Sequence, residues 1–169
     1  MAEAASSSGR LLAQFDREAA STRRMLERVP DDKFDWRPHP KSMTLGGLAN
    51  HISDLMGRAP MVLQTEFMDV GARSGQPRPA APTSTRELIE AFDRGVAAAR
   101  AAIAAASDEQ LSHPWSLRNG ETVLFSLPRG GVLHQQTSHM IHHRGQLSVY
   151  LRLNDVPVPG MYGPSADER

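Results

Sequence analysis

The stretch S-H-M-I-H-H-R-G-Q-L, residues 138–147, contains three histidines within five positions. It lies in a longer run, from about Gly131 to about Leu153, whose apolar residues recur at the spacing of an amphipathic helix. Each helical residue advances by about 100°, so His139 and His143 lie about 40° apart on one face and one turn apart along the axis. His142 lies about 60° to the other side of His139. The rings of His139 and His143 can therefore reach a common point, whereas His142 points to a different side of the helix.

A second helix is predicted from residue 43 to residue 68, in M-T-L-G-G-L-A-N-H-I-S-D-L-M-G-R-A-P-M-V-L-Q-T-E-F-M, with Ser42 as its N-cap. Pro60 is expected to kink or divide it, because proline lacks a backbone donor. His51 shares its stripe with leucines on either side, and the His139/His143 pair shares its side with Val132, Met140 and Leu147. All three histidines are therefore expected to face the core.

Two further helical patterns complete the fold prediction. One runs from Arg10 to about Glu27, and the other, alanine-rich, begins after a capping box at Ser84 and ends near Ala106. Proline-bearing connections separate the helices, and T-V-L-F at residues 122–125 could form a short strand, but no partner strand is evident. Four such helices predict an all-α fold, an antiparallel four-helix bundle in a single domain over residues 1–169.

Composition excludes several classes of protein. Lysine plus arginine and aspartate plus glutamate each number 19 in the 169 residues, so the chain has no net charge with which to bind nucleic acid. No segment approaches the roughly 18 apolar residues needed to span a bilayer, and the N-terminus has no targeting pattern, so we expect a soluble, cytoplasmic protein without a membrane partner. The chain has no cysteine, so any metal site must use nitrogen and oxygen ligands.

The three histidines have two interpretations. Two imidazoles one turn apart, with a third on another helix, supply neutral nitrogen donors that zinc, nickel, iron or copper accept, and they leave a coordination position open. The alternative is a set of core histidines that hydrogen-bond to carbonyl groups, and a histidine pair at this spacing without a glutamate is a weak pattern. Burying several imidazoles without a metal or acid partner would, however, leave polar atoms unsatisfied.

The segment H-M-I-H-H-R-G-Q-L resembles the H-x-x-x-H-R-G-Q signature of the DinB/YfiT-like superfamily of metal-dependent proteins. Two other segments agree with that resemblance, D-W-R-P-H-P-K-S-M-T-L-G-G-L-A-N-H and the tail P-G-M-Y-G-P-S-A-D-E, so that the matches extend from about residue 31 to residue 168. The resemblance implies a four-helix bundle of up-down-down-up topology, often a homodimer. It also implies a divalent metal held by His51, His139 and His143, with zinc or nickel expected.

Two chemistries follow from a metal with three protein ligands and an open position. The ion could activate water to hydrolyse a small ester or amide, or it could bind a low-molecular-weight thiol as the thiolate that attacks a small-molecule substrate. Some members of the superfamily are similar to thiol-dependent transferases that use bacillithiol or mycothiol, which favours the second chemistry. A metal- or ligand-binding module without enzymatic activity, and an ion that only stabilises the bundle, are further alternatives.

No catalytic residue is evident beyond these ligands. Glu66 is expected on the same side of the second helix as His51, and Asp54 off that stripe, but each fits an ordinary polar face better than a general base. Arg144 and Gln146 could orient imidazoles or have a structural role, and the structural role is favoured for Arg144. Gly145, unfavourable inside a helix, predicts close approach of a neighbouring backbone. His113, Trp115 and Tyr162 lie on connections that could line a pocket mouth or cover the core.

Overall fold

The computed structural model describes residues 6–72 and 80–168 of the chain. Its elements, in chain order, are helix α1 (Ser7–Leu26), the 3-10 helix η1 (Asp31–Lys33), α2 (Leu45–Met56), α3 (Ala59–Gln64), strand β1 (Phe67–Asp69), α4 (Thr85–Ala105), α5 (Asp108–Ser112), β2 (Pro114–Asn119), β3 (Thr122–Pro128) and α6 (Arg129–Arg152). Most of the described residues are helical, as the sequence predicts.

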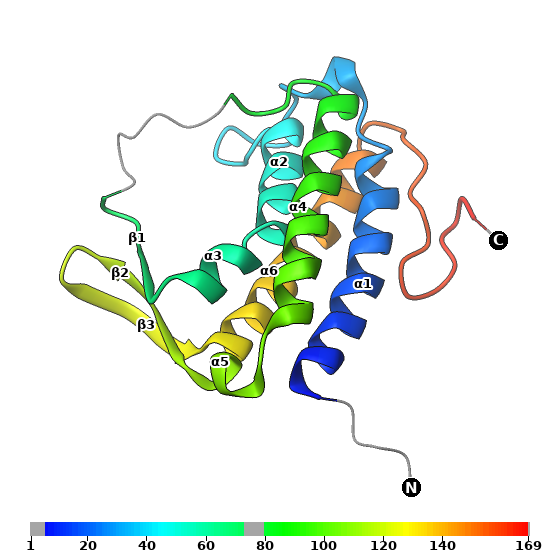
Figure 1. The fold of residues 1–169 in the computed structure, drawn as a ribbon. Helices are drawn as coiled ribbons and strands as arrows, with labels where there is room; N and C mark the ends of the chain where they lie inside the picture. Colours follow the sequence, from blue (N-terminus) through cyan, green and yellow to red (C-terminus); the bar gives the residue numbers. More distant parts are fainter. Residues whose placement is uncertain (1–5, 73–79, 169) are drawn as a thin grey trace, which may run out of the picture.

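The four longest helices pack side by side. Helix α1 contacts α4 and α6, and α2 contacts the same two helices, so each of these four helices packs against two of the other three. In the view of Figure 1, α1 and α6 run upward, and α2 and α4 run downward. The helix that carries His51 therefore lies beside the helix that carries His139 and His143, with opposite chain direction.

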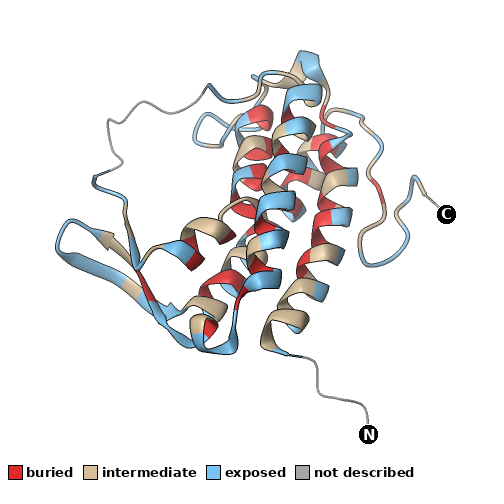
Figure 2. Cartoon of the chain, viewed as in Figure 1, coloured by how far each residue is buried: buried red, intermediate tan, exposed pale blue. Residues whose placement is uncertain are grey.

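One hydrophobic core fills the space between these helices. Figure 2 shows the buried residues on the inward sides of the long helices, with exposed residues on their outer sides. Burial of this apolar surface is the main favourable contribution to folding. Side-chain caps fix where the helices begin: Thr44 Oγ1 accepts from Gly47 N at 3.0 Å, and Ser84 Oγ accepts from Glu87 N at 3.3 Å. The expected cap Ser42 is thus wrong by two positions, and Thr44 caps α2.

The predicted second helix is divided into α2 and α3. Helix α2 ends at Met56, Gly57 is its C-cap, and Pro60 lies in the first turn of α3. Proline is tolerated there because the first backbone N–H groups of a helix have no intrahelical acceptor. The division agrees with the prediction that Pro60 interrupts the helix. The end of the predicted helix is wrong, because the chain leaves α3 at Gln64 and enters strand β1.

A three-stranded sheet contradicts the all-α part of the fold prediction. Strand β2 lies in the middle, parallel to β1 and antiparallel to β3, with Trp115 opposite Leu127. Gly120 and Glu121 form the tight turn of the β2–β3 hairpin, between the paired residues Asn119 and Thr122, and Gly120 has a φ of 59°. Glycine at the first turn position tolerates this positive φ, so the dipeptide Gly120-Glu121 directly before T-V-L-F is a hairpin signal. That dipeptide could have identified the partner of the T-V-L-F strand.

A buried ion pair joins α6 to α1. Arg144 and Glu18 are each 2% exposed, and Arg144 Nη2 lies 2.8 Å from Glu18 Oε2. The guanidinium also donates to Thr22 Oγ1 at 3.0 Å and to the hydroxyl of Tyr162 at 2.8 Å. A buried charge is tolerated only when it is paired and hydrogen-bonded, and both conditions hold here. This geometry agrees with the structural role predicted for Arg144.

Within residues 6–72 and 80–168, no helix has both the length and the apolar character needed to cross a membrane.

Candidate metal centre

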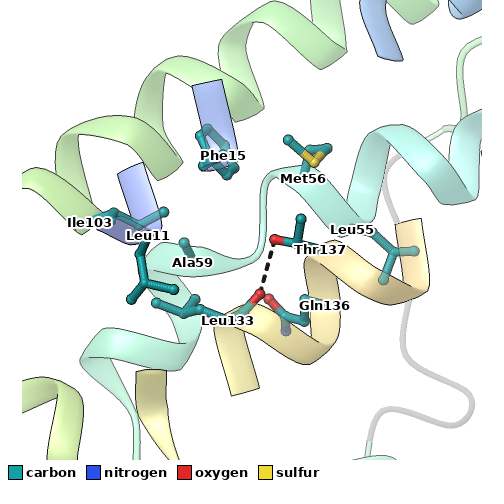
Figure 3. A pocket seen from close by; sticks show the side chains of 9 residues that line it. All are labelled: Leu11, Phe15, Leu55, Met56, Ala59, Ile103, Leu133, Gln136 and Thr137. Carbon is teal, nitrogen blue, oxygen red and sulfur yellow. Dashed lines mark hydrogen bonds between the residues drawn. The ribbon is translucent and has the colours of Figure 1, made fainter. Parts of the chain in front are cut away.

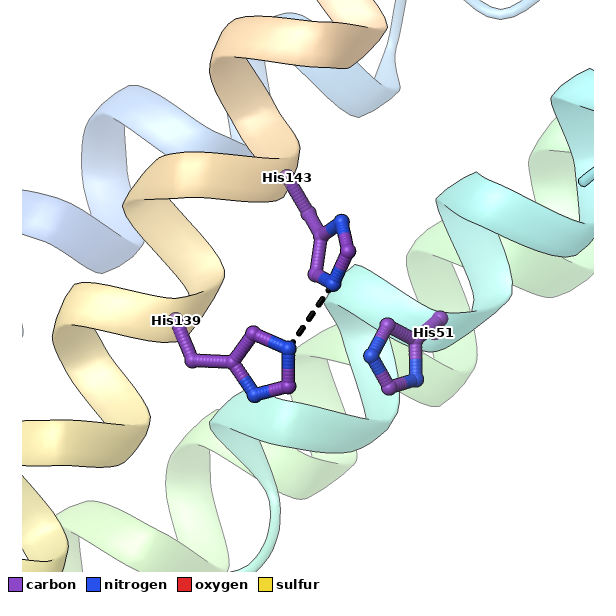
Figure 4. Close-up of side chains that lie close together, drawn as sticks. All are labelled: His51, His139 and His143. Carbon is purple, nitrogen blue, oxygen red and sulfur yellow. Dashed lines mark hydrogen bonds between the residues drawn. The ribbon is translucent and has the colours of Figure 1, made fainter. Parts of the chain in front are cut away.

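Three histidine rings from two helices meet at one side of the bundle. His51 projects from α2, and His139 and His143 project from successive turns of α6; Figure 4 shows the three rings pointing toward one another. One donor nitrogen from each ring can be chosen so that all three atoms lie within 4.8 Å of one another. The structure therefore brings together the three histidines that the sequence pattern and the resemblance single out, and it leaves His142 outside the cluster.

The cluster lies at the edge of the core and not inside it. His51 and His143 are half-buried, and His139 is exposed. The expectation that all three rings face the core is thus wrong for His139, because the inward side of α6 is occupied by residues such as Met140, Arg144 and Leu147. One side of the cluster is consequently open to solvent.

The ring contacts are close. The centroids of His139 and His143 are 4.6 Å apart, and those of His51 and His143 are 4.8 Å apart. His139 Nε2 and His143 Nε2 are separated by 2.8 Å, which is a hydrogen-bond distance. Two nitrogens bound to one tetrahedral ion at about 2.0–2.1 Å each would lie about 3.3 Å apart. A side-chain movement of about half an ångström would therefore convert the hydrogen-bonded pair into a pair of ligands.

The surroundings lower the pKa of the His51 and His139 imidazoles. Burial is the largest cause that lowers the pKa of His51, to about 4, and the charges of His143 and Arg58 add to it, while Asp54 opposes the shift. The pKa of His139 is also lowered, chiefly by desolvation of its ring although the residue as a whole is exposed. Neutral imidazole is the form that binds metal ions. At neutral pH these rings are therefore ready to act as nitrogen donors, and the three residues could hold a divalent transition metal.

Gln146 contacts two histidines at once. Its side-chain oxygen lies 2.7 Å from His143 Nδ1, and its side-chain nitrogen lies 3.0 Å from His142 Nε2. Metal-binding histidines commonly donate their second ring N–H to an acceptor of this kind. The prediction that Gln146 could orient an imidazole agrees with this contact. His142, exposed on the outer side of α6, contacts the cluster through the ring of His143, with the two ring centroids 5.1 Å apart.

Neither acid considered in the sequence lies among the histidines as a general base. Glu66 follows α3 and is exposed, and its backbone oxygen accepts from Ser116 N at 3.1 Å, so its predicted position on the helix of His51 is wrong. Asp54 is nearer, and its charge acts on His51. Its Oδ2 accepts from Arg58 Nε at 3.1 Å and from Arg58 Nη2 at 2.5 Å. Arg58 was missed in the sequence, although the Asp54–Arg58 spacing is that of a helical ion pair.

The aromatic residues on the connections cover the core. Trp115 is 1% exposed and donates its indole N–H to Thr65 Oγ1 at 3.1 Å. The hydroxyl of Tyr162 lies against the buried Arg144–Glu18 pair. Neither lines a pocket at the histidine cluster. Gly145 is exposed, and a Cβ placed on it would meet no atom within 4 Å, so the predicted close approach of another backbone is wrong within the described chain.

A small cavity lies about one helical turn from the cluster, on the core side. It is lined by nine residues from five helices, among them Leu55, one turn after His51, and Gln136, three residues before His139 (Figure 3). Its volume is about 20 Å³, enough for one water molecule or a methyl group. The side chains around it are mostly apolar. This cavity is too small to hold a substrate.

Comparisons with known proteins agree with this fold. The chain is similar to the uncharacterized protein YrdA of Bacillus subtilis (strain 168), with 26% identity over 160 residues that cover 93% of this chain and 89% of YrdA. A DinB-like protein from Bacillus cereus ATCC 10987 has a similar structure, with a TM-score of 0.66 and 24% identity, over 90% of this chain and 95% of that one.

The DinB-like protein YjoA of Bacillus subtilis is similar in structure as well. Its TM-score is 0.67 with 18% identity, over 95% of this chain and 99% of that one. At such identities the two solved structures show a shared fold only. The DinB family model matches residues 1–169, the whole chain. The chain belongs to the DinB family.

Proposed function

We propose that the protein is a metal-dependent enzyme that activates a low-molecular-weight thiol and transfers it to a small electrophilic substrate. His51, His139 and His143 are the proposed ligands, and zinc or nickel is the proposed ion. The observation that carries this proposal is the meeting of three imidazole nitrogens within 4.8 Å at a solvent-facing edge of the bundle. Three protein ligands with one side open are typical of catalytic sites, whereas structural zinc sites have four.

The charges at the site favour thiol transfer over hydrolysis. A divalent ion supplies Lewis acidity and lowers the pKa of a coordinated thiol or water. Hydrolysis would also call for a base that positions water, and the nearest acid, Asp54, is engaged by Arg58. A thiol needs no further base once it is ionised, and the chain has no cysteine that could serve as its own sulfur nucleophile.

The reactants are expected to approach from solvent. The cavity on the core side of the histidines holds about 20 Å³, which excludes even a small thiol. The open side is the one on which His139 is exposed. The Arg58 guanidinium, which also pairs with Asp54, acts electrostatically on both His51 and His139, so its charge extends to the open side of the cluster. It would attract an anionic reactant to this side of the site.

The proposal is tested by metal analysis and a reaction screen. Freshly purified protein is analysed for transition metals, and the metal-loaded protein is incubated with several low-molecular-weight thiols and a panel of electrophiles. His51→Ala and His143→Ala should abolish both metal retention and thiol transfer. His134→Ala, an exposed histidine on the same helix outside the cluster, is the matched control and should change neither. Hydrolysis of esters or amides without thiol transfer would replace this proposal with a hydrolase. Metal binding with no turnover would replace it with a binding module.

A further inference from the structure

The side-chain amide of Gln146 lies between two histidines of the same helix. Its oxygen faces His143 Nδ1 at 2.7 Å, and its nitrogen faces His142 Nε2 at 3.0 Å. The spacing of residues 142, 143 and 146 brings these groups together on consecutive turns of α6. Only one of the two histidines, His143, belongs to the proposed metal site.

The chemistry of the amide fixes the protons in this arrangement. An amide oxygen only accepts and an amide nitrogen only donates, so His143 Nδ1 carries the hydrogen and His142 Nε2 offers a lone pair. With Nδ1 protonated, neutral His143 presents the lone pair of Nε2 to the other rings. His139 Nε2, at 2.8 Å, then donates to it in the metal-free chain. The atom that Gln146 leaves unprotonated is the one that faces the cluster.

The opposite orientation of the amide would reverse the roles of the two His143 nitrogens. If the nitrogen of Gln146 faced His143, Nδ1 would have to accept, and the hydrogen of His143 would move to Nε2, inside the cluster. His142 Nε2 would then have to carry a hydrogen and donate to the amide oxygen. The tautomers of His142 and His143 are therefore coupled through Gln146, although the two rings bind different atoms of it.

We propose that Gln146 and His142 are positioning residues that hold His143 in the tautomer able to bind a metal through Nε2. Gln146 acts directly on His143, and His142 acts by fixing which way the Gln146 amide points. The effect is confined to His143, because no residue in the ranges 6–72 and 80–168 makes a comparable hydrogen bond to the outward nitrogen of His51 or His139. The expected change in zinc affinity rests on the metal site proposed above. The tautomer of His143 is a property of the metal-free chain and can be measured without that assumption.

The tautomer is measured first, without metal. Long-range ¹H–¹⁵N spectra of uniformly labelled protein in EDTA, at pH 8, distinguish a protonated Nδ1 from a protonated Nε2 for each histidine. His143 should show protonated Nδ1 in the native chain and in Gln146→Glu, whose carboxylate still accepts from Nδ1. In Gln146→Leu it should relax to a mixture of the two tautomers. Protonated Nε2 on His143 in the native chain would overturn the proposal.

Zinc affinity is measured second, by competition with a chelating dye. Loss of a hydrogen-bond partner behind a metal ligand commonly costs about 10–100-fold in affinity, and this exposed bond is expected to give about tenfold for Gln146→Leu. Gln146→Glu should stay within about threefold of the native chain. The matched control, Gln135→Leu, makes the same exchange at an exposed position of α6 outside the cluster and should leave the affinity unchanged.

His142→Ala tests whether His142 fixes the orientation of the Gln146 amide. Gln146 would keep its contact with His143 but lose the partner that fixes its orientation, so the affinity should fall by about threefold, less than in Gln146→Leu. An affinity in Gln146→Leu equal to that of Gln135→Leu would overturn the whole proposal, and an unchanged His142→Ala would overturn the part assigned to His142. Because neither measurement involves thiols or electrophiles, failure of the proposed enzymatic activity would be seen separately.

Discussion

Replacing Arg144 with methionine tests whether the buried ion pair stabilises the junction of α1 and α6. Arg144 and Glu18 are each 2% exposed, and the guanidinium makes hydrogen bonds to the Glu18 carboxylate, the Glu18 backbone oxygen, Thr22 and Tyr162. In Arg144→Met the carboxylate keeps the Tyr162 hydroxyl at 2.8 Å and the distant Arg17 at 3.6 Å. It becomes a buried charge without its main partner.

The expected loss in the free energy of unfolding is large, because Arg144 is removed while the charge of Glu18 stays buried. Breaking a buried pair in this way costs about 3–5 kcal/mol, which for a chain of this size lowers Tm by roughly 6–20 °C. The free energy of unfolding is measured by urea titration followed by circular dichroism, in EDTA so that metal does not contribute. Arg17→Met is the matched control; its side chain is 68% exposed, and the expected change is below about 0.5 kcal/mol.

A double substitution separates the pair from the packing of its side chains. Glu18→Leu with Arg144→Met removes both charges, and an apolar replacement of a buried pair is often neutral or stabilising. The double variant should therefore recover at least about 2 kcal/mol of the loss in Arg144→Met. A loss below about 1 kcal/mol in the single variant, or a double variant no more stable than the single one, would refute the reasoning.

Three further predictions concern the histidines and two glycines. The lowered pKa of His51, about 4, means that the unfolded chain binds more protons between about pH 6.5 and pH 4, so the metal-free protein should lose stability as pH falls through that window. The loss is about 1–2 kcal/mol for this half-buried ring, and a pH series of urea titrations should show a shallower slope in His51→Asn. Gly145→Ala should stabilise α6 by about 1 kcal/mol, because nothing lies within 4 Å of the added Cβ. Gly46→Ala should cost about 1–3 kcal/mol, because the added Cβ would overlap the ring of Phe34; thermal melts of the two alanine variants would show opposite shifts, and equal shifts would contradict the packing. Zinc at 100 times its Kd should stabilise the native chain by about 2.7 kcal/mol and leave the melting of His51→Ala unchanged, as differential scanning calorimetry would show.

The sequence predicted the long helices and the meeting of the histidines for a shared physical reason. Both depend on the 3.6-residue period, which places His139 and His143 on adjacent turns and His51 on a neighbouring stripe. The position of Pro60 likewise predicted the break between α2 and α3. The choice of His51 as the third donor depended on the resemblance as well, because periodicity alone does not say which helices are neighbours.

The predictions that were wrong concern features that are determined by tertiary contacts. Strand β2 has a mixed burial pattern and β3 is exposed along most of its length, so neither carries the clean alternation that marks a half-buried strand. The exposure of His139 could not be read from a helical projection, because the α6 face is shared with Arg144, whose burial depends on Glu18 of another helix. The metal ligation, the single domain and the homodimer implied by the resemblance stay predictions.

Residues 153–168, which follow α6, form no helix or strand, yet two acidic residues hold them against the helices. Asp167 accepts from Arg152 of α6 at 2.5 Å, and Glu168 accepts from Arg24 of α1 at 2.5 Å. The same carboxylates accept from the backbone N–H groups of Val158 and Gly160 within the segment. Backbone N–H groups that donate to carboxylates are protected from hydrogen exchange while the segment stays bound to the helices. The segment should therefore survive limited proteolysis under native conditions, despite a proline- and glycine-rich composition that ordinarily invites cleavage. Nicking of residues 153–168 by proteinase K in the folded protein would mean that the tail detaches, and with it Tyr162, whose hydroxyl contacts the buried Arg144–Glu18 pair.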